Sequence, residues 1–211
     1  MLSGDDREFV RALTESVAEL GLPLTDLQLK QMRLHYELLR KWNAKMNLTR
    51  ISAPREAARL HYGESIYGCS FLKGAASVLD VGSGAGFPAV PLAIMNRELA
   101  VTALESNQRK SVFLKEVKQQ LALSNLRVET ARIEDFQWSC YSAVTSRGLD
   151  RAEKMYAELV GNLNPGQTLM LFCSDAMMEA LCRDLPSGVE LEPHRIPNSE
   201  SRVVVFFKLA Y

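Results

Sequence analysis

The stretch VLDVGSGAGFPAV, residues 78–90, places three glycines and a proline between apolar residues. Gly82, Gly84 and Gly86 allow the backbone to turn tightly and to approach a ligand without a Cβ in the way. The apolar run before them reads as a strand, and Pro88 suits the first turn of a helix. Ligands of open parallel sheets bind beyond the carboxyl ends of the strands. We therefore expect a cofactor over this loop, although a tight strand-to-helix turn would use the same residue types.

Glu105 ends the next apolar run, AVTALE. An acid at the end of that strand can accept hydrogen bonds from both ribose hydroxyls of an adenosyl ligand, and an ordinary exposed glutamate is the alternative. The dinucleotide fingerprint GxGxxG would need glycine at position 87, where Phe87 stands. The two features together predict an adenosyl cofactor and disfavour NAD.

The rest of the chain from Ser77 alternates short apolar runs with helical stretches, which predicts a parallel, doubly wound α/β sheet. The expected strands are SVLDV, AVTALE, LRVETA, YSAVTS and QTLMLF, and the expected helices cover 88–95, 107–121 and 150–163. Two more strands, GVELEPHRI and SRVVVFFKL, follow without a helix between them, so we expect an antiparallel hairpin at the sheet edge. A Rossmann-like, seven-stranded sheet of this kind is the class I methyltransferase arrangement, which favours S-adenosylmethionine as the cofactor.

The segment before this sheet is helical in pattern. A first helix ends at Gly21, Thr25 suits the N-cap of a second helix, and Pro54 suits the first turn of a third that runs to about residue 71. We expect residues 1–74 to form an N-terminal helical extension and residues 75–211 to form the methyltransferase domain.

Charge is balanced overall but not locally. The 25 basic and 25 acidic residues give a net charge of zero, so the composition provides no global basic field. Residues 28–61 nevertheless hold eight basic residues against two acids, whereas residues 150–200 hold nine acids against four bases. We expect the basic segment, with two bases near the glycine loop, to face RNA; an ordinary solvated helix face is the alternative. The candidate RNA contacts are Arg33, Arg40, Lys41, Lys45, Arg109 and Lys110.

Several classes of protein are disfavoured by what the sequence contains. The four cysteines show neither a CxxC pair nor metal-ligand spacing, so we expect reduced cysteines and no metal site. The acidic start MLSGDDREF lacks the apolar core of a signal peptide, and no apolar run reaches the length of a membrane-spanning helix. We expect a cytoplasmic monomer.

The residues that usually mark particular methyl acceptors are not found. No cysteine follows a proline, as it would in pyrimidine carbon-5 enzymes, and TSRGLD stands where exocyclic-amine enzymes carry [DNS]-P-P-[YFW]. N7 of guanine offers an in-plane lone pair and loses no proton on methylation, so such an enzyme needs no general base, only positioning. A small-molecule acceptor fits the same pattern.

Arg147 directly follows the fourth expected strand, beside the expected cofactor site. A guanidinium there could hold a phosphate, the methionine carboxylate or a guanine edge, and so position the reactants. The alternative is a structural ion pair with a neighbouring acid.

The sequence resembles the small-subunit (16S) rRNA methyltransferase G family, also called glucose-inhibited division protein B, over nearly its whole length. LLRKWNAKMNLTRI, residues 38–51, is close to the family signature L-x-x-W-N-x-x-x-N-L-T, which general methyltransferases lack. The other similar stretches are HYGES (61–65), DVGSGAGFPAVPLAI (80–94), ESNQRKSVFL (105–114), ARIEDF (131–136), SR (146–147) and SRVVVFFK (201–208).

The resemblance implies transfer of a methyl group from S-adenosylmethionine to N7 of a guanine in the 530 loop of 16S rRNA, within the small ribosomal subunit. It implies that Gly82 and Phe87 line the cofactor cleft, that Ile133 and Glu134 flank the adenine, and that Arg147 completes the site. Glu105 stands where the family has an acid for the ribose. Trp42, Asn43 and Asn47 match the signature, and we expect them to pack and to anchor the following loop.

Four positions depart from the family pattern. Glu64 replaces an aspartate, Ala89 a glycine and Gly148 an alanine, and LFCSD lacks the lysine of the family's L-K-G motif. If that lysine holds RNA phosphate, this protein would bind RNA more weakly or act on another substrate. A methyltransferase for another RNA or a small molecule, and a non-catalytic protein that binds the adenosyl ligand or RNA, therefore remain alternatives.

Overall fold

A seven-stranded sheet forms the centre of the protein, in the order β3-β2-β1-β4-β5-β7-β6. The computed structural model describes residues 3–148 and 152–209. The strands are β1 (Ser77–Val81), β2 (Ala100–Leu104), β3 (Leu126–Glu129), β4 (Ala143–Arg147), β5 (Thr168–Ser174), β6 (Val189–Arg195) and β7 (Arg202–Leu209). Strands β1 to β5 are parallel, and β7 runs antiparallel to both β5 and β6. The predicted sheet and its terminal hairpin are confirmed.

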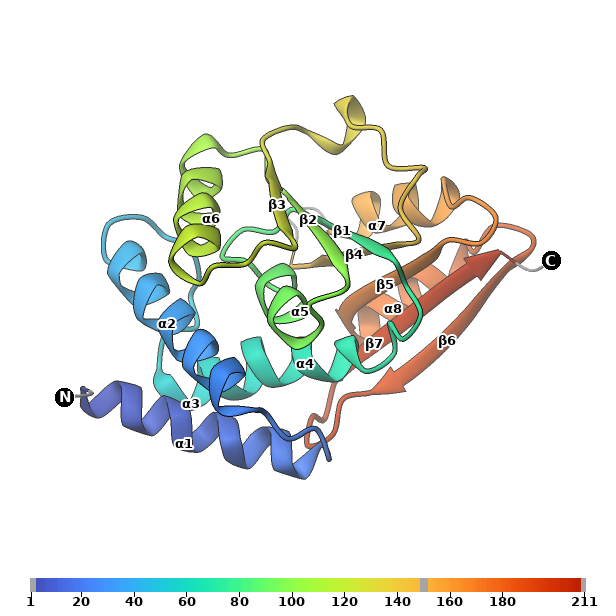
Figure 1. The fold of residues 1–211 in the computed structure, drawn as a ribbon. Helices are drawn as coiled ribbons and strands as arrows, with labels where there is room; N and C mark the ends of the chain where they lie inside the picture. The colour runs from blue at the N-terminus through green and yellow to red at the C-terminus, as the bar shows by residue number, and fades with distance from the viewer. Residues whose placement is uncertain (1–2, 149–151, 210–211) are drawn as a thin grey trace.

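Helices precede and separate the strands (Figure 1). They are α1 (Gly4–Glu19), α2 (Asp26–Asn43), α3 (Pro54–Glu56), the π-helix η1 (Ala57–Gly63), α4 (Glu64–Cys69), α5 (Ala89–Met95), α6 (Gln108–Gln120), the 3-10 turn η2 (Ile133–Asp135), α7 (Ala152–Gly161) and α8 (Asp175–Arg183). The start of the helix expected over 150–163 lies outside the described residues. Helix α8 was not predicted; Ser174, whose hydroxyl accepts a hydrogen bond from the Met177 amide, caps it.

The two faces of the sheet are covered by different helices, as Figure 1 shows. Val78 of β1 belongs to a hydrophobic cluster with residues of α1, α2, α5 and α6, whereas its neighbour Leu79 belongs to a cluster with residues of α7 and α8. Because successive side chains of a strand point to opposite faces, an apolar strand can support both layers. The near-continuous apolar runs of the sequence follow from this burial on both sides.

Local signals place the first two helices where the sequence predicts them. Gly21 follows α1 with φ of +67°, a left-handed conformation that ends a helix. Thr25 caps α2: its hydroxyl accepts from the Gln28 amide, and the Gln28 side chain accepts from the Thr25 amide at 2.9 Å.

The third helix is not one regular α-helix but the series α3, η1 and α4. Gly63, which interrupts the helical pattern of the sequence, lies at the end of η1 against α1. A Cβ at this position would lie 2.6 Å from Oγ of Ser16, so glycine allows α1 to approach the helix closely. The N-terminal helices share one hydrophobic cluster with the sheet, which extends from Phe9 to Phe206. The division between residues 74 and 75 stays a prediction.

The W-N signature anchors the loop after α2. The side chain of Asn43 accepts from the amides of Leu48 and Thr49, at 2.8 and 3.0 Å, and donates to the Thr49 carbonyl at 3.0 Å. Trp42 donates from Nε1 to Glu116 of α6 at 3.0 Å. The packing and anchoring roles expected for Trp42 and Asn43 are confirmed. Asn47 is exposed, and its side chain makes no hydrogen bond within the described part of the chain.

Replacement of Asn43 should therefore destabilise the fold much more than replacement of Asn47. We expect Asn43→Ala to lower the free energy of unfolding by about 2 kcal/mol, because it removes three hydrogen bonds that are each worth roughly 0.5–1.5 kcal/mol. Asn47→Ala is the matched control and should change it by less than about 0.5 kcal/mol. Urea unfolding measures both, and equal effects would contradict the anchoring role.

Candidate functional site

The glycine loop, residues 82–88, is held against the end of the neighbouring strand. Val81 and Leu104 are paired at the carboxyl ends of β1 and β2. The Leu104 carbonyl accepts from the amides of both Gly82 and Ser83, at 2.9 and 3.1 Å. The chain therefore turns back over the sheet edge immediately after β1, as the sequence predicts.

The glycines of this loop serve two purposes. Gly82, Gly84 and Gly86 have φ of +72°, +55° and +89°, in the left-handed region that favours glycine. A Cβ at Gly84 would meet only the Gly82 carbonyl oxygen, at 3.7 Å, so this part of the loop is open to a ligand. A Cβ at Gly86 would lie 2.7 Å from Cγ2 of Val90 and 3.3 Å from Nε2 of His35. Packing beneath the loop therefore requires glycine at position 86. From the sequence, Gly86 was expected only to let the backbone turn and approach a ligand.

Glu105 lies where the sequence places it, beside the loop and directly after β2. Its side chain is buried, and its two oxygens accept from the amides of Gly84 and Asn107 at 2.9 and 2.8 Å. A carboxylate has about four lone-pair positions, so each oxygen can accept a further hydrogen bond. The arrangement fits an acid that holds the loop and accepts from a ligand hydroxyl.

Asp80 is a second buried acid at this edge, and it was not among the site residues expected from the sequence. Its Oδ2 accepts from the Ala89 amide at 3.2 Å, and its Oδ1 has no hydrogen-bond partner among the described residues. Burial raises the pKa of this carboxyl to about 7, and Glu105 adds to the effect. Asp80 therefore places a carboxyl group with a pKa near neutrality beneath the glycine loop.

Arg147 ends β4, as the sequence predicts, and its guanidinium is enclosed by protein groups. Its Nη2 lies 2.6 Å from the Leu60 carbonyl oxygen and 3.0 Å from Oε2 of Glu64, and its Nη1 donates to the His61 carbonyl at 3.3 Å. The side chain is only 9% exposed. The structural ion pair, which was the alternative, is present, and it is buried because α4 and η1 cover the end of β4. A contact of Arg147 with cofactor or substrate stays a prediction.

Glu64, one of the departures from the family pattern, joins two strands through two arginines. Besides Arg147, it contacts Arg202 of β7, whose Nη2 donates to Oε2 at 2.8 Å. Burial lowers the pKa of Arg147 to about 10, whereas the Glu64 carboxylate acts to raise it, so the guanidinium stays charged at neutral pH. Removal of Glu64 would leave the buried Arg147 guanidinium without its carboxylate, which is costly.

Phe87 packs beneath the loop. Its ring stacks on His61, with centroids 4.4 Å apart and an interplanar angle of 12°, and meets the Tyr62 ring edge-on at 4.9 Å. The ring is buried against the N-terminal helices, and the expectation that Phe87 lines the cofactor cleft stays a prediction.

Ile133 and Glu134 lie in η2, which follows the carboxyl end of β3. Ile133 is half-buried and packs against the cluster on the α7 side of the sheet, and Glu134 is exposed. Both are near the edge that carries Glu105, because Leu104 and Glu129 are paired at the ends of β2 and β3. Their contact with adenine stays a prediction.

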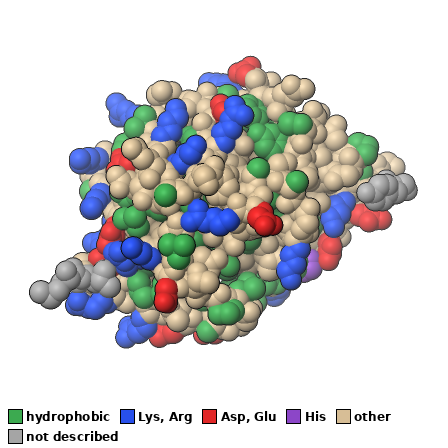
Figure 2. Space-filling view, viewed as in Figure 1, with side chains coloured by type: hydrophobic (Ala, Val, Ile, Leu, Met, Phe, Trp, Pro, Cys, Tyr) green, Lys and Arg blue, Asp and Glu red, His purple; other side chains and the backbone are tan. Residues whose placement is uncertain are grey.

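The basic residues predicted to face RNA fall into two groups. Arg33 pairs with Glu37, and Arg40 pairs with Asp5 at 2.5 Å, so these two arginines stabilise α2 and its contact with α1. The other four make no ion pair within residues 3–148 and 152–209: Lys41, Lys45, Arg109 and Lys110. Figure 2 shows Lys and Arg side chains gathering on the side of the molecule where α2 and α6 lie in Figure 1.

The position of the missing L-K-G lysine lies at the end of β5. Here Ser174 caps α8, and Asp175 makes a two-point ion pair with Arg195, with both N···O distances 3.1 Å. The segment LFCSD, for which the resemblance implies a lysine, thus carries an acid, Asp175, that is paired with the chain's own hairpin.

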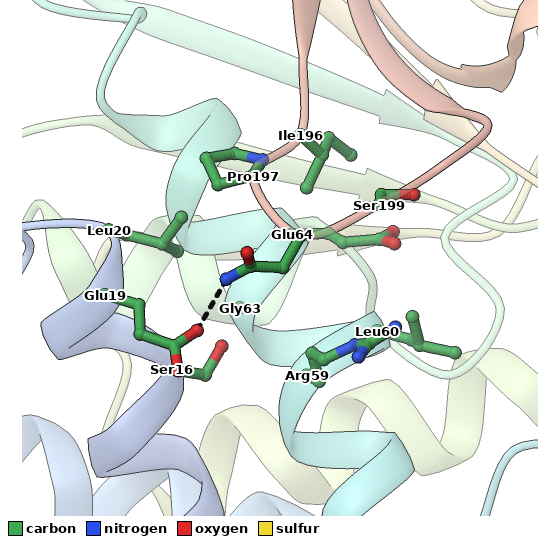
Figure 3. A pocket seen from close by; sticks show the side chains of 11 residues that line it. Ser16, Glu19, Leu20, Arg59, Leu60, Gly63, Glu64, Ile196, Pro197 and Ser199 are labelled. Carbon is green, nitrogen blue, oxygen red and sulfur yellow. Dashed lines mark hydrogen bonds between the residues drawn. The ribbon is translucent and has the colours of Figure 1, made fainter.

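A small hollow of about 20 Å³ lies between α1, η1 and the β6–β7 loop (Figure 3). Asn198 donates to Glu19 across it at 2.7 Å. The hollow has room for a water molecule and includes no residue of the glycine loop. Among the residues that the structure describes, no cluster of His, Cys, Asp and Glu could hold a metal ion, and no helix has the length and apolarity to cross a membrane.

The raised pKa of Asp80 predicts a pH-dependent stability. Its pKa is about 7 in the folded protein against an ordinary value of 3.8, so between these values the folded protein holds a proton that the unfolded chain has lost. This contribution to stability is present at low pH and is lost as the pH rises through about 7. We expect wild type to lose stability relative to Asp80→Asn between about pH 4 and about pH 7, with no further loss above that range, measured by urea unfolding. A constant difference would contradict the raised pKa.

Comparisons with known proteins agree with this geometry. The profile of the family described as rRNA small subunit methyltransferase G matches residues 28–185. The chain is 37% identical over 182 residues to the Ribosomal RNA small subunit methyltransferase G of Stutzerimonas stutzeri, covering 85% of this chain and 84% of the relative. It is 35% identical over 185 residues to the protein of the same name from Methylococcus capsulatus, covering 87% and 89%.

Solved structures show the same fold at low sequence identity. The ribosomal protein L11 methylase of Lactobacillus delbrueckii is similar with a TM-score of 0.56 and 12% identity, covering 72% of this chain and 80% of that one. TYW2 of M. jannaschii, solved in complex with AdoMet, is similar with a TM-score of 0.52 and 17% identity, covering 69% and 74%. The fold is that of class I methyltransferases, and the chain belongs to the rRNA small subunit methyltransferase G family of S-adenosylmethionine-dependent methyltransferases.

Proposed function

We propose that this protein transfers the methyl group of S-adenosylmethionine to N7 of a guanine in the 530 loop of 16S rRNA, in the small ribosomal subunit. The proposal rests on two features of this family member that lie at the same edge of the sheet. The open glycine loop with Glu105 lies at the carboxyl edge of the sheet. Arg109 and Lys110, which make no ion pair with the described residues, lie in the helix that starts at the same edge.

The residues at this edge fit the cofactor. Gly84 leaves the loop open, and the Glu105 carboxylate keeps acceptor positions for the two ribose hydroxyls. Ile133 offers an apolar contact for the adenine, and Glu134 lies beside it. The cofactor, when bound, supplies a sulfonium methyl group that is transferred by in-line displacement.

The described residues suit an acceptor that needs no base. His35, His61 and Asp80 are buried, so none of them is open to an acceptor; desolvation lowers the pKa of each histidine to about 3 and raises that of Asp80 to about 7. Both oxygens of Glu105 already hold backbone amides. N7 of guanine forms its new bond to carbon with its own lone pair and loses no proton, while the bond from the methyl carbon to sulfur breaks. The protein's task is then to hold the base in line with the methyl group.

The RNA surface that we propose combines the exposed end of α2 with the first turn of α6. The hydrogen bond from Trp42 to Glu116 joins these helices. Lys41 and Lys45 on α2 and its following loop are exposed, as is Arg109 on α6. Contacts of these Lys and Arg side chains with RNA phosphates supply salt-dependent affinity. Extrusion of the target guanine from an RNA loop presents it to the site.

We further propose that the protein acts as a monomer in the cytoplasm, where its substrate particle is assembled. The large apolar side chains that are exposed in the described part are dispersed over α2, the α4–β1 loop and α6: Leu27, Phe71 and Val112. Scattered apolar residues do not form the contiguous patch that a stable dimer buries.

The decisive test uses labelled S-adenosylmethionine and small ribosomal subunits that lack the modification. We expect methyl incorporation into 16S rRNA, and borohydride followed by aniline should cleave the chain at 7-methylguanosine in the 530 loop. Incorporation at another nucleotide would correct the target.

A second candidate is a methyltransferase for a different substrate. It is favoured by the segment LFCSD, which lacks the lysine that the resemblance implies and whose Asp175 is paired with Arg195 of the hairpin. Cofactor binding without incorporation into small subunits would support this candidate.

Removal of the Lys41 and Lys45 side chains should weaken binding to the small ribosomal subunit but not to the cofactor. We expect Lys41→Ala with Lys45→Ala to raise KM for the small subunit and to reduce the salt dependence of binding by roughly one unit of slope per lysine. Affinity for the cofactor should not change. The matched control is Lys73→Ala with Lys208→Ala, because these exposed lysines lie at the opposite, amino-terminal edge of the sheet. Equal losses in both double variants would contradict the proposed surface.

Loss of the Glu105 carboxylate should weaken cofactor binding. We expect Glu105→Ala to reduce the binding free energy for S-adenosylmethionine by about 1–3 kcal/mol, the scale of charged hydrogen bonds. Calorimetry measures the dissociation constant, and Glu98→Ala, at an exposed position before β2, is the control. An unchanged dissociation constant would remove Glu105 from the site.

A further inference from the structure

His35 connects the second N-terminal helix with the cofactor loop. It belongs to α2, far from the loop in sequence, and is completely buried. Its Nε2 lies 3.0 Å from the carbonyl oxygen of Ala85, in the middle of the glycine loop. Its Nδ1 lies 3.0 Å from the hydroxyl of Tyr62 in η1.

These two contacts define the proton position on the ring. A carbonyl oxygen can only accept, so Nε2 carries the proton and donates to Ala85. Nδ1 is then the acceptor for the Tyr62 hydroxyl. Burial lowers the pKa of His35 to about 3, so the neutral ring is the form present at neutral pH. Tyr62 thus holds the imidazole in the tautomer that can bind the loop.

The loop is shaped to receive this ring. His35 Nε2 would lie 3.3 Å from a Cβ on Gly86, so the glycine allows the imidazole to reach the Ala85 carbonyl. The rings of Phe87 and Phe113 lie 5.2 and 6.0 Å from His35, centroid to centroid, and support it from the sides.

The other hydrogen bonds that the structure describes for the glycine loop do not involve the N-terminal helices. They come from the loop itself and from the ends of β1 and β2: Gly82 and Ser83 donate to Leu104, and Gly84 donates to Glu105. Within the described residues, His35 makes the one hydrogen bond between the N-terminal helices and residues 82–88. Gly84 and Gly86 adopt left-handed conformations, and glycine has the largest conformational freedom of any residue, so a contact from outside the loop has most effect on this segment.

We propose that His35 is a positioning residue for the cofactor: through the Ala85 carbonyl it holds the glycine loop in the conformation that binds S-adenosylmethionine. The role goes beyond the proposed function, because it concerns the cofactor loop and is independent of which nucleotide is methylated. His35 does not touch the reacting atoms in this arrangement; it acts through the backbone of the loop.

The test measures cofactor binding by calorimetry in the absence of RNA. His35→Phe keeps a buried ring but removes the donor, and we expect it to weaken binding by about tenfold, the scale of one hydrogen bond with a loop left unheld. His35→Gln restores a side-chain N–H and should recover part of this loss. Tyr62→Phe removes only the partner that sets the tautomer, and should weaken binding less than His35→Phe. Thermal unfolding is followed for every variant.

A destabilised control separates loop positioning from general loss of stability. Val17→Ala creates a cavity in α1, within the same hydrophobic cluster, and should lower Tm with no change in the dissociation constant. If His35→Phe fails to fold, Tyr62→Phe and long-range ¹⁵N spectra of the wild-type histidines decide. The expected spectrum shows a neutral His35 protonated at Nε2.

Two outcomes would overturn the proposal. One is unchanged cofactor affinity in folded His35→Phe, or in Tyr62→Phe if the former does not fold. The other is a His35 ring protonated at Nδ1, which could not donate to Ala85. Failure of methylation on small subunits would leave both measurements intact, so it would contradict the proposed substrate and not the role of His35.

Discussion

The arrangement of the site depends on how the chain turns back at the end of β1. Two consecutive amides, from Gly82 and Ser83, donate to the single carbonyl of Leu104, and Glu105 then takes the amide of Gly84. This contact is possible because β1 and β2 are parallel neighbours whose carboxyl ends are in register. The same acid that holds the loop keeps lone pairs for a ligand, so loop conformation and ligand recognition are linked through one carboxylate.

The N-terminal helices are part of this arrangement as well as a surface for RNA. Phe87 packs on His61 beneath the loop, and Arg147 is enclosed by the carbonyls of η1 and by Glu64. Buried charges of this kind need partners in fixed positions, which makes the packing of helices against the sheet specific. The π-helical form of η1, whose carbonyls at Leu60 and His61 accept from Arg147, belongs to the same contact.

Most of the fold could be predicted because its signals are local. The Thr25 cap, the turn at Gly21 and the alternation of apolar runs with helices are read directly from neighbouring residues. Helix α8 was missed because its nine residues, DAMMEALCR, carry a cap but follow the fifth strand without a separating turn. The charged residues were harder to assign, since Arg33 and Arg40 share with Lys41 the same helix and the same residue class.

By itself, the sequence determined the order of the elements, the glycine loop at the end of β1 and the acid at position 105, because each depends on short-range backbone preferences or on periodicity. Only the tertiary structure decided which charges are free and which are paired, since the partners of Arg40 and Arg147 are remote in sequence. It also decided that Gly86 makes room for His35. A contact between residues 35 and 85 leaves no pattern in the local sequence, and arises only when α2 packs beneath the loop.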